Sequence, residues 1–93
     1  MSFKFEKLIV WQWAMDWGEE IFLLTKKFPP EEKFNLTSQL NRVVDSIALN
    51  ISEGSILQSK LEMKRFFGYS IRSISECITC LYKADRRNYI SKN

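Results

Sequence analysis

Apolar residues at alternating spacings of three and four are the feature that most restricts how this chain can fold. The clearest set is Leu36, Leu40, Val43, Ile47 and Ile51. Because an α-helix turns once every 3.6 residues, this spacing places all five on one helical face. No segment of the sequence alternates apolar and polar residues with the period of two that is typical of a β-strand. The sequence therefore predicts an all-α fold.

Proline, glycine and a capping sequence divide the chain into three predicted helices. The segment FPP at residues 28–30 ends the first helix, because the residue before a proline is pushed out of the helical region. Gly54 suits the C-terminal cap of the second helix. Ser59 and Glu62 form a capping box that opens the third. We expect a single domain over residues 1–93, with helices at about 6–27, 30–53 and 60–88.

Short turns between these helices favour an antiparallel up-and-down bundle. The first helix has an apolar seam and, on another side, a second apolar set. The seam comprises Val10, Ala14, Trp17, Ile21, Leu24 and Phe28, and the second set comprises Leu8, Trp11, Met15 and Phe22. A helix that is apolar on two sides is buried on two sides. The second side needs a partner, which is either another helix of the same chain or another subunit. We expect Trp11, Met15 and Phe22 to form an oligomer contact.

The third helix is expected to turn an apolar stripe to the core and a charged face outward. The predicted stripe comprises Met63, Phe66, Phe67, Ile71, Ile74, Cys77, Ile78 and Leu81. The candidate contacts to RNA or DNA phosphates are Arg65, Arg72, Lys83, Arg86 and Arg87. Glu76 interrupts this charged face, which favours an ordinary solvated surface over a nucleic-acid site.

A polar stripe accompanies the apolar stripe of the second helix at the same spacing. Its members are Gln39, Arg42, Ser46, Asn50 and Glu53. One interpretation is a solvated flank of the helix. The other is a buried hydrogen-bond network or a subunit interface, since guanidinium, amide, hydroxyl and carboxylate groups can satisfy one another. We favour the second interpretation, because open helical surface usually carries Lys and Glu instead.

The sequence offers no catalytic or metal-binding constellation. The chain has no histidine, which removes the usual general base. Its two cysteines, Cys77 and Cys80, are three residues apart within a predicted helix, and a zinc site needs four ligands. We interpret them as small buried apolar residues. The expectation is a protein that is not an enzyme and binds neither a metal nor a cofactor.

Charge and hydropathy limit the remaining classes of function. The net charge is +3 and the pI is about 9.0, well short of the dense basic clusters of a dedicated nucleic-acid-binding domain. No segment approaches the roughly 20 apolar residues of a membrane span, and the N-terminus lacks a signal-peptide cleavage site. Trp11, Trp13 and Trp17 lie on both sides of one helix, which disfavours a membrane-surface helix. We expect a cytoplasmic protein without membrane contact.

Four pieces of the sequence resemble the four-helix-bundle proteins encoded in intervening sequences of bacterial large-subunit ribosomal RNA genes. They are FEKLIVWQWA, LTKKFPPEEKFNLTSQL, RVVDSIALNISEG and RFFGYSIRSISE. The most specific part of the resemblance covers residues 36–54. The chain departs from the family at Asn41, where a second arginine beside Arg42 is usual, and this weakens a nucleic-acid interpretation.

The resemblance implies an antiparallel four-helix bundle that assembles into a homopentamer, with a dimer as the alternative. It also implies a relation to the accessory variability proteins of retroelements, whose basic pentamers bind nucleic acid. Ser91 resembles the cap of the family's fourth helix, and only two residues follow it. We therefore expect three long helices, a truncated fourth, and a homo-oligomeric scaffold. The alternative function is weak, sequence-tolerant binding of RNA or DNA.

Overall fold

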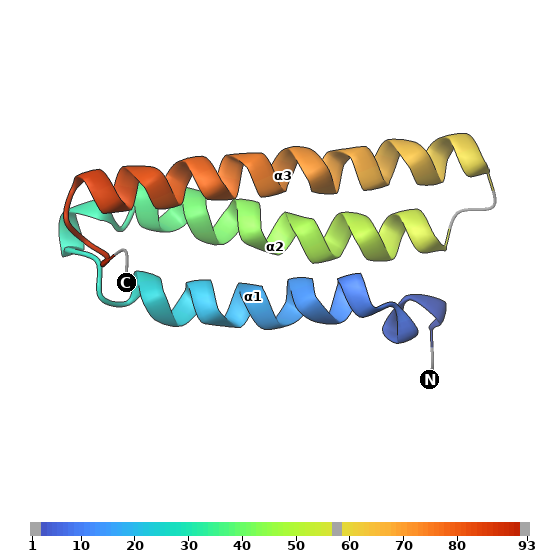
Figure 1. Ribbon diagram of the computed structural model, residues 1–93, viewed down its shortest axis with the longest axis horizontal. Coiled ribbons are helices and arrows are strands. Elements are labelled where there is room, and N and C mark those ends of the chain that lie inside the picture. Colours follow the sequence, from blue (N-terminus) through green and yellow to red (C-terminus); the bar gives the residue numbers. More distant parts are fainter. Residues whose placement is uncertain (1–2, 57–58, 92–93) are drawn as a thin grey trace.

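The computed structural model describes residues 3–56 and 59–91, and three long helices dominate it (Figure 1). They are α1 (Ile9–Thr25), α2 (Leu36–Ser55) and α3 (Lys60–Arg86), accompanied by the short 3-10 helices η1 (Lys4–Lys7) and η2 (Pro30–Glu32). These described residues contain neither a strand nor a fourth α-helix. The all-α prediction is therefore confirmed.

The helix α2 lies between α1 and α3, and both pack against it (Figure 1). Over the described part of the chain, α1 and α3 make no comparable contact with each other. The helix α2 consequently supplies most of the core, and the apolar stripe predicted for it is buried. Its buried apolar residues are Leu36, Leu40, Val43, Val44, Ile47, Ala48 and Ile51.

The connection between α1 and α2 differs from the expected start of the second helix near residue 30. Residues Pro30–Glu32 form η2, and α2 begins only at Leu36. The Glu32 carboxylate explains this start, because its Oε1 accepts hydrogen bonds from the Leu36 backbone N–H at 3.3 Å and from Asn35 Nδ2 at 3.0 Å. A carboxylate from outside the helix thus caps the positive end of α2.

The face of α3 that packs against the core is not the isoleucine-containing face that the sequence predicted. Its buried residues are Ser70, Ser73, Cys77, Cys80 and Ala84, again at spacings of three and four. Ser70 Oγ donates a 3.0 Å hydrogen bond to the backbone oxygen of Ile47 on α2, and Ser46 Oγ donates to Ser73 Oγ. Small side chains allow the two helices to approach closely, and their hydroxyls are satisfied across the contact.

Three isoleucines placed in the core by sequence reasoning are therefore exposed in the single chain. Ile71 is 67% exposed, Ile74 36% and Ile78 44%. They lie beside the row of small residues on α3, so that row and not the isoleucines faces α2. Exposed isoleucines spaced along one helix are unusual for a monomer, whose exposed apolar patches are normally small.

Candidate interaction site

An apolar groove separates α1 from α3, with α2 as its floor; we call it the α1–α3 groove. Its volume is about 520 Å³. The α1 wall carries Val10, Trp13 and Trp17, the floor carries Ile47 and Ile51, and the α3 wall carries Ile74. Val10 was expected in the core seam but is 52% exposed, because α3 does not reach α1 at this level.

One isoleucine of α3, Ile74, lines the groove, and two others lie beside it on the exposed side of the helix. Ile71 precedes Ile74 by three residues and Ile78 follows it by four, so the three form one apolar strip. At a rise of 1.5 Å per residue the strip is about 10 Å long. Trp13, on the opposite wall, is also exposed. Two apolar helical faces therefore flank a space that this chain leaves open.

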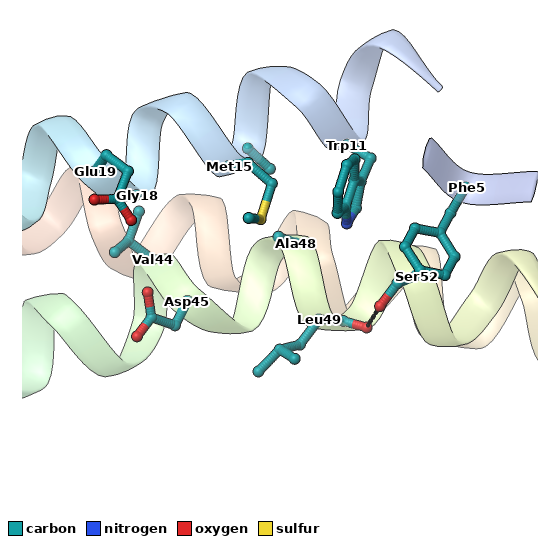
Figure 2. A pocket seen from close by; sticks show the side chains of 11 residues that line it. Phe5, Trp11, Met15, Gly18, Glu19, Val44, Asp45, Ala48, Leu49 and Ser52 are labelled. Carbon is teal, nitrogen blue, oxygen red and sulfur yellow. Dashed lines mark hydrogen bonds between the residues drawn. The ribbon is translucent and has the colours of Figure 1, made fainter. Parts of the chain in front are cut away.

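A second hollow, the α1–α2 cavity, lies on the other side of α1 and has a volume of about 380 Å³. Figure 2 shows the carboxylates of Glu19 and Asp45 at one end of it and the rings of Trp11 and Phe5 at the other. Met15 lies between the two ends. The cavity is therefore apolar along its length and acidic at one end.

The three residues expected to form an oligomer contact do not all share one hollow. Trp11 and Met15 line the α1–α2 cavity, not the α1–α3 groove. Phe22 is exposed farther along α1, where Lys26 Nζ lies 4.6 Å from the centre of its ring. The second apolar side of α1 is thus real, and it faces away from the groove.

The polar stripe of α2 is split between contact with α3 and open surface. Ser46 meets Ser73 of α3, and Asn50 Nδ2 donates a 2.8 Å hydrogen bond back to the Ser46 backbone oxygen. Arg42 and Glu53 are exposed, and neither has a hydrogen bond or ion pair to the other described residues. Gln39 is half-buried. The single chain therefore joins only the middle of the stripe to a neighbouring helix.

A buried carboxylate that sequence reasoning missed holds one end of the bundle together. Glu32 is 6% exposed, and its Oε2 accepts hydrogen bonds from Arg87 Nη1 at 2.8 Å and from the Tyr89 hydroxyl at 2.7 Å. Asn88, with φ 61°, adopts the left-handed conformation that asparagine tolerates, and this turns Tyr89 back toward the bundle. The only sequence signal for this cluster is an acidic residue within a helix break.

Ionisation of Glu32 reflects these contacts. The Tyr89 hydroxyl, followed by the Leu36 backbone N–H, Asn35 and Arg87, lowers the pKa of the Glu32 carboxyl from its ordinary value of 4.5. Burial acts in the opposite direction but does not reverse the shift. The same hydrogen bond raises the pKa of the Tyr89 hydroxyl above its ordinary value of 10.0. The cluster therefore favours a charged carboxylate and a neutral phenol.

The five candidate nucleic-acid contacts fall into different environments. Arg87 is bound to Glu32, and the Arg72 guanidinium lies 5.7 Å from the centre of the Tyr69 ring. Arg65, Arg72 and Lys83 share one exposed face of α3, as their spacing predicts. Arg86 is exposed, without an ion pair to any described residue. Only four of the five cations thus remain available to a partner.

Both cysteines lie in the contact between α2 and α3. Cys77 is fully buried and Cys80 nearly so. Burial raises the pKa of the Cys77 thiol to about 11 and also raises that of Cys80. Among residues 3–56 and 59–91, no three cysteine, aspartate or glutamate side chains gather closely enough to hold a metal ion. No helix in the same residues has the length and apolar character needed to cross a bilayer.

A family model covers nearly the whole of this chain. The family described as 23S rRNA-intervening sequence protein matches residues 6–93. Since the match covers nearly the whole sequence, the chain belongs to this family, as the sequence resemblance predicted. A search of curated proteins found no match.

Proposed function

We propose that this chain is a non-enzymatic subunit of a homo-oligomeric scaffold. The observation that carries the proposal is the open α1–α3 groove, with Trp13 and Trp17 on one wall and Ile74 on the other. Covering apolar surface contributes roughly 25 cal/mol per Å² buried, before the costs of association. A second copy is the partner always present at matching concentration.

For the number of subunits, the single chain gives no value, and the proposal relies on the sequence resemblance. The resemblance favours a homopentamer, with a dimer as the alternative. Light scattering coupled to size exclusion, over a range of micromolar concentrations, measures the mass directly. A well-folded monomer at these concentrations would overturn the proposal.

A second candidate function is weak binding of RNA or DNA through α3. It is supported by the exposed face shared by Arg65, Arg72 and Lys83, although Glu76 lies close to this line. Binding of this kind rests on phosphate contacts, so its affinity falls steeply with salt and varies little with sequence. Fluorescence anisotropy with labelled RNA at several salt concentrations tests it. Tight binding that ignores salt would contradict this mode.

A further inference from the structure

The outer surface of α3 carries an exposed row that combines apolar and basic side chains. The row consists of Ile71, Ser75, Ile78, Tyr82 and Arg86, spaced by four, three, four and four residues. All five are exposed, and the row contains no acidic residue. Its basic end is Arg86, which has no ion pair to the described residues. Such a face suits a surface that is apolar along its length and acidic at one end.

The α1–α2 cavity has this complementary character. No basic residue lines it, and Glu19 and Asp45 have neither an ion pair nor a hydrogen bond to the described residues. Figure 2 shows Trp11, Met15 and Glu19 in succession along one side of α1. They are spaced by four and four residues, as are Ile78, Tyr82 and Arg86 on α3. Each triplet spans about 12 Å of helix.

We propose that the α1–α2 cavity of one copy receives the outer row of α3 from the next copy. In this register Arg86 meets the carboxylates of Glu19 and Asp45, and Tyr82 lies over Met15. Ile78 then lies near Trp11. The opposite direction would put Lys64 at the acidic end and Ile71 toward Trp11, but Gly68 would then lie over Met15 and leave the middle of the cavity unfilled.

This register fixes the type of symmetry. It sets α3 of one copy parallel to α1 of the next, and α1 and α3 already run in the same direction within one chain (Figure 1). Neighbouring copies therefore share one direction, and the contact joins two different surfaces. Such a heterologous contact closes into a ring when the rotation allows it. The inference rests on the proposed homo-oligomer and adds to it a second contact, distinct from the α1–α3 groove.

Charge reversal tests the pairing at exposed positions. We expect Glu19→Lys with Asp45→Lys to raise the dissociation constant of the assembly on the order of tenfold or more, and Arg86→Glu to do the same. All three changes on one chain should restore assembly, because each contact again joins opposite charges. The matched controls are Glu76→Lys and Arg65→Glu, on the other flank of α3, and these should leave the mass unchanged. Circular dichroism verifies that every variant keeps its helical content.

Cysteine cross-linking tests the register independently. A chain with Met15→Cys and Tyr82→Cys should give a ladder of disulfide-linked species under oxidation, ending at the ring size. An isologous contact would stop at a covalent dimer, which would overturn the inference. Either cysteine alone should give no ladder, and Phe22→Cys with Tyr82→Cys is the off-register control.

The outcomes separate this inference from the proposed function. A monomeric native chain would overturn both. A native oligomer that ignores the charge reversals, or one that the triple variant does not restore, would overturn the interface alone. Loss of assembly in the reversals with recovery in the triple variant supports both.

Discussion

The Tyr89 hydroxyl donates a 2.7 Å hydrogen bond to Oε2 of Glu32, which lies 57 residues earlier in the chain. The same oxygen accepts a hydrogen bond from Arg87. Since the other carboxylate oxygen caps α2, one side chain joins the start of α2 to the exit of α3. This end of the bundle is closed by polar contacts, whereas the middle is closed by apolar packing.

Replacement of Glu32 by glutamine should lower the melting temperature clearly more than replacement of Glu31. Glu31→Gln is the matched control, because Glu31 is exposed and adjacent in sequence. The Glu32 change removes the charge that Arg87 and Tyr89 bind, and it leaves Arg87 without its partner. Thermal denaturation followed by circular dichroism measures both variants. Equal melting temperatures would mean that the cluster contributes nothing to stability.

Acid should weaken the fold through the same carboxylate. The folded-state pKa of Glu32 is lowered below its ordinary value of 4.5, so its contribution is present above pH 4.5 and is lost as the pH falls through the folded value. The melting temperature should therefore decline between about pH 5 and pH 3. Glu32→Gln should decline less over this range than Glu31→Gln. If the melting temperatures of the two variants fell equally with pH, groups other than Glu32 would be responsible for the acid sensitivity.

Two glycines in helices should respond oppositely to alanine. A Cβ added at Gly54 would lie 2.9 Å from Phe67 Cε1 and 3.1 Å from Phe66 Cβ. A Cβ added at Gly68 would have no neighbouring atom within 4 Å. Gly68→Ala should stabilise the fold by about 0.5–1 kcal/mol through helix propensity. Gly54→Ala should cost about 1–3 kcal/mol, because the contact between α2 and α3 must shift. Urea denaturation measures both, and a stabilising Gly54→Ala would contradict the packing described.

A charge placed in the α1–α3 groove should dissociate the assembly without unfolding the chain. Trp13 is 67% exposed in the single chain, so a glutamate there should not unfold the chain. Burying its carboxylate in a subunit contact costs free energy, so the change should weaken the assembly. We expect the dissociation constant to rise at least tenfold by analytical ultracentrifugation. Phe34→Glu is the control, because Phe34 is more exposed than Trp13 and lies outside the groove. Retention of full assembly by Trp13→Glu would show that the groove is not a subunit contact.

The two thiols should resist modification in the folded protein. Cys77 and Cys80 are buried and their pKa values are raised, so little thiolate is available near pH 8. A thiol reagent should label both only after denaturation, and elemental analysis should find no stoichiometric zinc. Rapid labelling of native protein, or about one zinc per chain, would overturn the packing role given to this pair.

Sequence periodicity predicted the buried face of α2 well, because no other face of this helix carries as many apolar residues. The helix α3 carries two rows at the same spacing, one of isoleucines and one of small residues such as Ser73 and Cys77. From hydrophobicity alone, the isoleucine row is predicted to face α2. In the structure the row of small residues faces α2, because small side chains let the two helices pack closely, and this is visible only in the tertiary structure.

The Glu32 cluster was beyond sequence reasoning for a different reason. Its partners Arg87 and Tyr89 lie 55 and 57 residues away, and no local pattern links them. Arg87 consequently looked like one of several free cations on α3. Conversely, the apolar second side of α1 was predictable, because Trp11 and Met15 repeat at helical spacing.

The central place of α2 also determines how the chain opens. Because the backbone of α1 packs against α2 and not against α3, α1 can detach while the pair of α2 and α3 stays closed. Amide protons of α1 should then exchange with deuterium sooner than those in the middle of α2. The helix that carries the tryptophans of the groove would thus be the first to leave, and assembly would lock it in place.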